Sequence, residues 1–467
     1  MKCLLRLLIC TLSGFLSAAE QPNIVVFISD DHSQFDSQAY GSTEVRTPNM
    51  AKLAEDGLKF THAFVASPSC GPSRTALLTG LWSARNGAEA NHKAKRPDVP
   101  SLPSVLRDIG YEVVVIGKVA HGNWAQLYDF DAVIGPPVGI SDTTDVANFL
   151  NQRISKKPLC LFVGTRHPHV PWSESPTYDP ARVQIPPTHV DTAVTRAERA
   201  KYLTDITHSD TLLGEVRTLA QEKIPGDTLF IYTADHGSQW PFAKWNLYDA
   251  GIRIPLLITW PGTLKPSTST DAMVCWPDLL PTFIELGGGK VPDGIDGQSF
   301  AGILRGTTTK HRDQIFATHS GDGDFNVYPV RSVRTRDWKY IRNLHPEFQH
   351  HSHISRSTGP SGLAYWQTWL SAAENNPSAA ATVKRFSTRP AEELYDLAAD
   401  PNELHNLAAD PKHADRRAKM SGDLDGWMQQ QGDTQTVFGT PLLQGEPVTL
   451  INKEDVKKAK AKATKQP

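Results

Sequence analysis

The chain has 467 residues, with 48 Lys and Arg against 50 Asp and Glu, so its formal net charge at pH 7 is −2. This balance gives no indication of a nucleic-acid partner, and the length is sufficient for one large core domain and a smaller one. Five cysteines, two of them within the first ten residues, are too few for a disulfide scaffold.

The N-terminus reads "MKCLLRLLICTLSGFLSAAE". Lys2 and Arg6 precede and interrupt an apolar run, and Ser17 and Ala19 are the small residues that mark a cleavage site. We therefore expect residues 1–19 to be a signal peptide and the protein to be secreted or periplasmic. The apolar run is too short to span a bilayer, so no stable membrane span is expected.

Apolar segments rich in β-branched residues alternate with amphipathic segments from residue 22 onward. In chain order we expect the strand "NIVVFISDD", the helices "TPNMAKLAEDG" and "SLPSVLRDIG", and the strands "YEVVVIGK" and "PLCLFVGTRHPH". A long helix over 195–223 and the strand "DTLFIYTADHG" follow. Continuous apolar strands that alternate with helices predict an α/β fold, in which a large, mostly parallel sheet is sandwiched by helices.

Four of these strands end in residues that carry chemistry: Asp30-Asp31, Lys118, His169 and Asp235-His236. Ligands of parallel sheets bind beyond the carboxyl ends of the strands, so we expect one shared site. Three carboxylates gathered without a cation would repel one another, and a hard divalent ion such as Ca²⁺ or Mg²⁺ relieves that repulsion. Taken singly, each Asp pair has the alternative role of capping the next helix.

The segment "SPSCGPSRTALLTG" places Cys70 at the start of a short expected helix, with Pro72 in its first turn and Gly80 at its end. Unpaired N–H groups at a helix N-terminus favour negative charge, so this position suits a nucleophile or an anion site. Cys160 and Cys275 lie in apolar runs, and we expect them to be buried rather than bonded.

The pattern changes after about residue 310, where hairpin-like strands and a helix over 412–430 are expected. We predict a catalytic α/β domain over 20–310 and a smaller α+β domain with a short antiparallel sheet over 311–440. A basic, disordered tail is expected over 441–467.

Residues 345–390, rich in His, Ser and aromatic residues, are expected to be irregular. The histidines of this segment indicate either an exposed substrate-facing loop or a second metal site; they are His345, His350, His351 and His353. Arg331, Arg334 and Trp338 either line a sugar pocket or are ordinary residues of the sheet.

"CGPSRTALLTG" contains the pattern C-x-P-S-R followed by x-x-L-x-T-G, with "SDD" upstream and "GK", "HPHVPW" and "TADHG" downstream. These spaced motifs resemble those of type I sulfatases of the alkaline phosphatase superfamily, across nearly the whole chain after the signal peptide. The segment "YPVRSVRTRDWKYIRNLHPEF" is similar to the heparan N-sulfatase (sulfamidase) branch. That branch has Arg and Asn where this chain has Lys244 and His236.

The resemblance implies that Cys70 is oxidised to formylglycine (3-oxoalanine) by a formylglycine-generating or anaerobic sulfatase-maturating enzyme. The hydrate of this aldehyde would then be the nucleophile, held by Arg74. The resemblance also implies one Ca²⁺, bound by Asp30, Asp31, Asp235, His236 and the modified Cys70.

Further roles are implied for basic residues. In "GKVAHG", Lys118 and His121 would be catalytic, and His121 would remove a proton from the hydrate. The two-residue spacing is that of iduronate-sulfatase-like members. His169 and Lys244 would bind sulfate and support the leaving group. Two more substrate-binding residues are expected, His167 and Arg331.

The expected activity is removal of sulfate from a sulfated carbohydrate, either a glycosaminoglycan, including N-sulfoglucosamine, or another sulfated saccharide. One alternative is a phosphonate or phosphate ester hydrolase of the same superfamily. Another is a non-catalytic protein that binds sulfated glycans. The last alternative predicts lost catalytic residues, whereas every expected position is filled.

Overall fold

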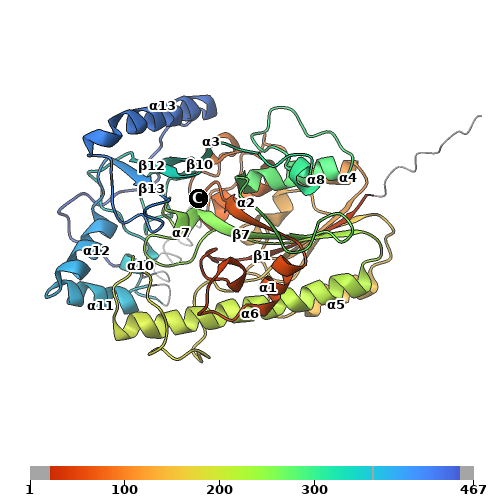
Figure 1. The fold of residues 1–467 in the computed structure, drawn as a ribbon, viewed down its shortest axis with the longest axis horizontal. Helices are drawn as coiled ribbons and strands as arrows, with labels where there is room; N and C mark the ends of the chain where they lie inside the picture. Colours follow the sequence, from red (N-terminus) through yellow and green to blue (C-terminus); the bar gives the residue numbers. More distant parts are fainter. Residues whose placement is uncertain (1–20, 360–361, 453–467) are drawn as a thin grey trace, which may run out of the picture.

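A computed structural model describes residues 21–359 and 362–452, so the expected signal peptide lies outside the described residues. The centre of the molecule is a sheet in which nine described strands take part (Figure 1). They are β1 (Asn23–Ser29), β2 (Leu58–Phe64), β3 (Glu112–Gly117), β4 (Ala132–Ile134), β5 (Leu159–Gly164), β6 (Thr228–Ala234), β7 (Arg253–Thr259), β8 (Thr268–Thr270) and β9 (Val274–Cys275).

The strand order is β4-β3-β5-β1-β6-β7-β2-β8, with β9 beside β2. At the centre, Val26 of β1 pairs with Phe162 of β5 and Ile231 of β6, and both pairings are parallel. Strand β7 runs antiparallel to its neighbours β6 and β2. The predicted mostly parallel sheet is confirmed, and the carboxyl ends of β1, β3, β5 and β6 meet at one edge.

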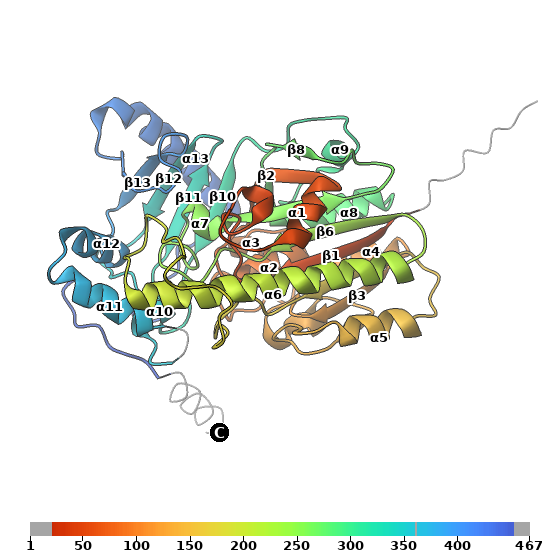
Figure 2. The ribbon, with the colours of Figure 1, turned by 60° about the horizontal axis from the view of Figure 1, so that its bottom comes forward.

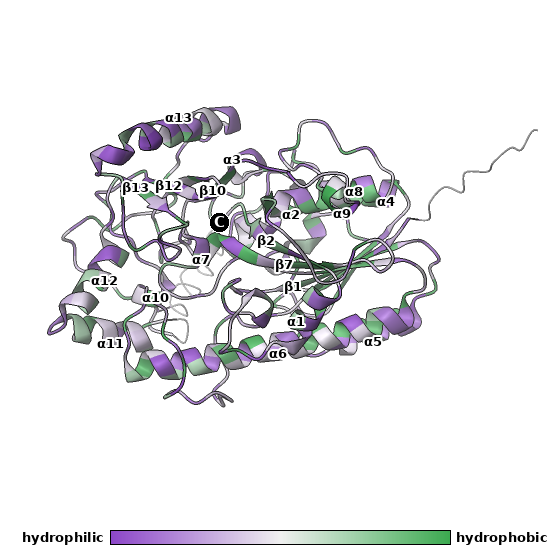
Figure 3. Cartoon of the chain, viewed as in Figure 1, coloured by the Kyte–Doolittle hydropathy of each residue, from purple (hydrophilic) through white to green (hydrophobic). Residues whose placement is uncertain are grey.

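Helices cover both faces of the sheet, which is why its strands are almost continuously apolar. Ile24 and Val26 of β1 belong to one buried core, whereas Val25 and Phe27 belong to the other. Figure 3 shows the apolar residues concentrated in these strands. The helices on the two faces lie on opposite sides of the sheet (Figures 1 and 2): α2 (Cys70–Thr79), α4 (Leu102–Asp108) and α8 (Leu279–Leu286) on one, α1 (Pro48–Glu55), α5 (Thr144–Gln152) and α6 (Ala193–Lys223) on the other.

A second, four-stranded sheet follows, and it is antiparallel throughout, as predicted. Its strands are β10 (Ile315–His319), β11 (Val330–Arg334), β12 (Trp338–Asn343) and β13 (Glu392–Asp396), and α13 (Ala414–Gln431) packs on β11 and β12. Three short helices complete the connections before it: α3 (Ser83–Asn86), α7 (Asp249–Ile252) and α9 (Ala301–Leu304).

Two sequence-based expectations for this region are corrected. Residues 345–390 are not irregular, because they contain α10 (His353–Arg356), α11 (Ala364–Ala373) and α12 (Pro377–Ser387), whose aromatic side chains are buried. Residues 441–452 are not a loose tail, since the backbone N–H of Gln349 donates to Leu442 O at 2.7 Å and that of Ile451 donates to Arg356 O at 2.7 Å. The basic residues after 452 lie outside the described residues. Cys160 and Cys275 are buried and unbonded, as expected.

A buried ion cluster joins the second sheet to the first. Asp249 of α7 accepts hydrogen bonds from Arg334 Nε at 3.0 Å and Nη2 at 2.9 Å, and its Oδ1 lies 2.6 Å from Lys339 Nζ. Burial raises the pKa of Asp249, but Arg334 and Lys339 outweigh it and hold that pKa well below its ordinary range. Arg334 is therefore a structural residue of the sheet contact and does not line a sugar pocket.

We predict that Asp249→Ala destabilises the protein by about 3–5 kcal/mol, because it leaves the buried Arg334 guanidinium without its carboxylate and leaves Lys339 with Glu403 alone. The contribution of Asp249 is present above the ordinary carboxyl pKa and is lost as the pH falls toward its lower folded value. Urea denaturation at neutral pH measures the effect. Asp293→Ala, which removes a carboxylate that is 88% exposed and paired with Lys290, is the control, with a change of about 0–1 kcal/mol. Equal midpoints for the two variants would contradict the role of the cluster.

Candidate active site

The end of β1 turns sharply and brings two adjacent carboxylates into one site. Asp31 has a left-handed backbone, with φ of 68°, and its N–H donates to Asp235 Oδ1 at 3.0 Å. Asp235 follows β6, and its own N–H donates to Ser29 O at 3.2 Å. An L-residue in this conformation is strained, and such strain is typical of functional sites.

A cluster suited to a divalent cation results. The ligand atoms of Asp30, Asp31, Cys70, Asp235 and His236 all lie within 4.8 Å of one another, and all five residues are buried. Burial, with Asp30 adding to it, raises the pKa of Asp31 to about 7. The three carboxylates make the donor set rich in oxygen, which fits Ca²⁺ or Mg²⁺ better than a soft metal.

The ring of His236 is oriented for this cluster. Its Nδ1–H donates to Gly237 O at 2.8 Å, which turns Nε2 toward Cys70 Sγ at 3.2 Å and Asp31 Oδ1 at 3.4 Å. Burial lowers the pKa of His236, but Asp235, Cys70 and Asp31 outweigh it and raise that pKa to about 9. A bound cation would take the place of this proton at Nε2.

Cys70 is the first residue of α2, as the sequence predicted, and the helix ends at Gly80 in a left-handed conformation. Its Sγ lies 3.7 Å from both Asp30 Oδ1 and Lys118 Nζ. Burial raises the pKa of the thiol, but Lys118 and Lys244 outweigh it and lower that pKa below its ordinary value. The site therefore favours negative charge at this position.

Arg74, one turn along α2, ties the strand ends together. Its Nε donates to Asp235 Oδ2 at 3.0 Å and its Nη2 donates to Asp30 Oδ1 at 3.2 Å, while Nη1 bonds to the carbonyl of Lys118. The guanidinium is fully buried, so it fixes the carboxylates as well as neutralising them.

Three further basic groups surround the carboxylates. Lys118 Nζ bonds to Asp30, and Lys244 Nζ lies 2.8 Å and 2.9 Å from the two oxygens of Asp31. His169 Nε2 lies 4.0 Å from Asp31 Oδ2, and its Nδ1–H donates to a backbone carbonyl. Burial and Lys244 lower the pKa of His169 well below its ordinary value, so this ring is neutral.

Glycines allow the ends of β3 and β5 to approach closely enough to present Lys118. A Cβ on Gly164 would lie 2.0 Å from Lys118 O, and one on Gly117, whose φ is +78°, would lie 2.3 Å from Gly164 O. No side chain fits at either position.

These residues surround a cavity of about 220 Å³. Its lining includes the predicted residues Cys70, Lys118, His121, His169 and Lys244, together with Asn91, His92, Val170, Pro171, Gln239, Trp245, Asp322 and His353. Trp245 is adjacent to Lys244, and His353 belongs to the histidine-rich segment, so both carried a sequence signal. Asn91, His92 and Asp322 had no spacing or motif that marked them.

Two predicted substrate-binding residues do not line this cavity. Arg331 is buried and paired with Asp433, with Nε–Oδ2 at 2.5 Å and Nη2–Oδ1 at 2.9 Å. His167 lies beside Asp205, and its backbone carbonyl accepts the N–H of Asp30 at 3.2 Å. Arg331 is therefore structural, and His167 positions the end of β1 through its backbone.

The histidine-rich segment is only partly exposed. His350, His351 and His353 are buried, and none of the metal-ligand groups found among the described residues includes a histidine of this segment. The segment is therefore not an exposed loop, although His353 does line the site. Trp338 packs under the guanidinium of Arg416, 4.1 Å from its ring centroid, and is a residue of the sheet.

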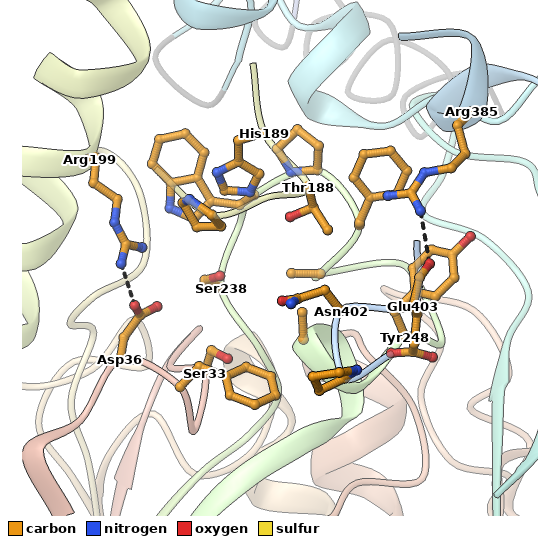
Figure 4. Close-up of a pocket in the computed structure, with 18 residues that line it drawn as sticks. Ser33, Asp36, Thr188, His189, Arg199, Ser238, Tyr248, Arg385, Asn402 and Glu403 are labelled. Carbon is orange, nitrogen blue, oxygen red and sulfur yellow. Dashed lines mark hydrogen bonds and ion pairs between the residues drawn. The ribbon is translucent and has the colours of Figure 1, made fainter. Parts of the chain in front are cut away.

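Figure 4 shows a second cavity, of about 100 Å³, whose lining includes Ser238, His189 and Tyr248. Residues 240–243 line this second cavity, whereas Gln239, Lys244 and Trp245 line the first. The ion pair of Arg199 with Asp36 lies at one side of it, and the hydrogen bond from Arg385 to the carbonyl of Glu403 lies at the other (Figure 4). The segment that carries Lys244 is a wall between two cavities, and packing on its rear side supports this lysine.

The family follows from comparison with known proteins. The sulfatase family model matches residues 22–289, and the model of the N-sulphoglucosamine sulphohydrolase C-terminal region matches residues 234–361. The chain belongs to the sulfatase family and is a sulfuric ester hydrolase.

Particular relatives cover nearly all of the chain. An "Ulvan-active sulfatase" of Formosa agariphila is 31% identical over 438 residues, which cover 91% of this chain and 84% of the relative. Human N-sulphoglucosamine sulphohydrolase is 26% identical, with 90% and 92% covered. A solved 2-O GAG sulfatase has a TM-score of 0.69 at 21% identity, with 92% and 99% covered, and shows the same fold. In the described part of the chain, no helix is both long and apolar enough to traverse a bilayer.

We predict that a divalent cation, supplied as Ca²⁺, stabilises the chelator-treated protein by about 2.7 kcal/mol at a hundred times its dissociation constant. Asp31→Asn should lose this gain because it removes a carboxylate from the cluster, whereas Asp293→Asn on the surface should keep it. Thermal unfolding with and without Ca²⁺ provides the measurement. An undiminished gain in Asp31→Asn would place the cation elsewhere.

Proposed function

We propose that the protein is a secreted or periplasmic sulfatase that removes sulfate from a sulfated carbohydrate, using a formylglycine formed from Cys70 and one Ca²⁺. The observation that carries this proposal is the position of Cys70, at a helix N-terminus within 3.7 Å of Asp30, Lys118 and His236. The sequence C-x-P-S-R around it is intact, as a maturation enzyme of either expected kind requires. The proposed location rests on the pattern of residues 1–19.

The residues of the site fit both a formylglycine at position 70 and a Ca²⁺ ion. The modified side chain would supply the nucleophilic oxygen, and Ca²⁺ would supply positive charge for the sulfate oxygens. Asp30, Asp31, Asp235 and His236 would hold the cation with residue 70, because their ligand atoms already converge there.

The chain's own cations bind and orient the sulfate. Lys118 and Lys244 are buried ammonium groups that line the cavity, so their charges act at short range on an anion. An anionic ester beside His169 favours the protonated form of its ring, which can then donate to the leaving oxygen or nitrogen. Arg74 keeps the carboxylates fixed during the reaction.

His121 is the group available to accept a proton. Its Nδ1 is buried and has no hydrogen-bond partner among the described residues, and the ring lines the same cavity as Cys70. Burial and Lys118 lower the pKa of His121 to about 3, so the ring is neutral and Nδ1 or Nε2 carries a lone pair.

The proposed substrate class rests on the cavity wall and on the relatives. Trp245 and His353, whose rings stack on each other, and Asp322 contribute aromatic and polar groups to the cavity wall, and such groups suit a sugar ring. The related proteins are named for ulvan and for N-sulphoglucosamine. Assays on ulvan oligosaccharides, O-sulfated glycosaminoglycan fragments, N-sulfoglucosamine and a phosphonate monoester test the proposal; preference for the phosphonate would overturn it.

We predict that Cys70 carries an aldehyde when the protein is produced together with a sulfatase-maturating enzyme. Peptide mass spectrometry should detect the modified residue, and Cys70→Ala should lower the activity by about 10³-fold or more, because the nucleophile is lost. Cys160→Ala replaces another buried cysteine and serves as the control, with activity retained. Full activity of a preparation whose Cys70 is entirely a thiol would exclude the mechanism.

We predict different defects for the two histidines. His121→Gln should release the alcohol in a first-turnover burst and then release sulfate about 10²–10⁴-fold more slowly, because its proton acceptor is lost. His169→Gln should slow the burst itself, most strongly for poor leaving groups. Rapid-quench kinetics with aryl sulfates separate the two. Identical burst behaviour would contradict the division of roles.

A further inference from the structure

A chain of polar contacts, one hydrogen bond and one ion-pair contact, leads from His121 out of the active site. His121 Nε2 lies 2.8 Å from His92 Nδ1, and His92 Nε2 lies 3.3 Å from Asp322 Oδ1. The three residues come from distant parts of the chain: the segment after β3, the loop after α3 and the loop after β10. His92 has a left-handed backbone, with φ of 63°, which is uncommon for this residue and typical of functional positions.

Asp322 is a fixed, ionised end of this chain. It is 2% exposed, and its Oδ2 accepts hydrogen bonds from Trp245 Nε1 at 2.7 Å and Asn91 Nδ2 at 3.0 Å. Burial raises the pKa of Asp322, but His353 and His92 outweigh it and hold that pKa well below its ordinary value. Oδ1 therefore remains a hydrogen-bond acceptor toward His92.

The Asp322 carboxylate at one end of the chain of contacts determines the tautomer of His121 at the other end. A carboxylate at Oδ1 requires that His92 Nε2 carry the hydrogen, so that Nδ1 of a neutral His92 is an acceptor. His121 must then donate from Nε2, which leaves the lone pair on its Nδ1. Nδ1 is the buried atom without a hydrogen-bond partner, and the His121 ring lines the cavity that also contains Cys70.

We infer that His92 and Asp322 are positioning residues that hold His121 in the Nε2–H tautomer and carry a proton away from it. The inference rests on the proposed function for its chemical setting. A proton leaving the reacting hydroxyl at residue 70 binds to His121 Nδ1, and the Nε2 proton of His121 passes to His92 Nδ1. His121 is then neutral with its hydrogen on Nδ1, and the positive charge lies on His92. The Nε2–H tautomer is regained when His92 returns a proton to His121 Nε2 and the Nδ1 proton leaves to water in the emptied cavity.

The surroundings favour this transfer. A charge on His121 would be buried close to Lys118 and Arg74, and these surroundings lower the pKa of His121 to about 3. The side chain of His92 is 59% exposed and lies beside the Asp322 carboxylate. Positive charge is therefore better solvated and better paired on His92 than on His121.

The first test reads the tautomer directly. Nitrogen-15 NMR of histidine-labelled protein with unmodified Cys70 distinguishes protonated from unprotonated ring nitrogens, and His121→Gln assigns the signals. We expect His121 to be protonated at Nε2 and not at Nδ1, and we expect Asp322→Asn to introduce the opposite tautomer. His121 protonated at Nδ1 in the native sequence would overturn the inference.

The second test separates relay from orientation. His92→Asn suits the left-handed backbone and keeps an acceptor oxygen toward His121, but it cannot take up a proton. We expect His121 to keep its tautomer while the rate of sulfate release falls about 10–100-fold and the acid side of its pH profile moves, with the alcohol burst unchanged. The matched control is His405→Asn, since His405 is 78% exposed beside Asp400, and it should behave as wild type.

Failure of the relay can be distinguished from failure of the proposed sulfatase function. An unchanged sulfate-release rate and pH profile in His92→Asn would overturn the relay. If the native protein hydrolyses none of the sulfate esters, the proposed function fails, but the NMR measurement on the unmodified protein still decides the tautomer. Folding of each variant is checked by its thermal midpoint, and Asp322→Glu, which retains the carboxylate, should restore the native tautomer if Asp322→Asn alters it.

Discussion

The structure depends on gathering three carboxyl groups, those of Asp30, Asp31 and Asp235, in one buried site. Buried charges of one sign are costly unless opposite charges and hydrogen bonds compensate them. Arg74, Lys118 and Lys244 supply that compensation, and each contacts at least one of the carboxylates directly. The sharp backbone turn at Asp31 and the glycine contact between β3 and β5 are the local adjustments that bring these groups together.

Much of this site could be predicted from the sequence, because its residues follow apolar strands. Asp30, Lys118 and Asp235 stand where runs of buried aliphatic residues stop, and parallel strands end at a common edge. The position of Cys70 could be predicted for a different reason: Pro72 and Gly80 mark the limits of the helix that presents it. Local patterns of this kind predicted the main sheet, the smaller antiparallel sheet and the charged cluster between the strands.

The remaining features depend on partners far away in the chain. Arg331 sits in an alternating strand whose pattern does not reveal that Asp433, 102 residues later, binds its guanidinium. Helix α11 was missed because its stability depends on the tertiary burial of Trp366 and Trp369. Asp322 belongs to a glycine-rich turn that reads as an ordinary loop, and only the folded chain places it beside the indole of Trp245.

The walls of the active site and its chemical centre have different structural origins. The carboxylates and Cys70 belong to the large sheet and the helix packed on it, whereas Asp322 and His353 come from the loop after β10 and from α10. The turn around Asp322 contacts the rest of the site through Asn91 and Trp245, and the backbone N–H of Asn91 donates to Gly321 O at 2.9 Å. A change in this turn would therefore alter the cavity wall and the positioning inferred for His121 together, whereas Cys70 and the carboxylates would keep the places that the large sheet gives them.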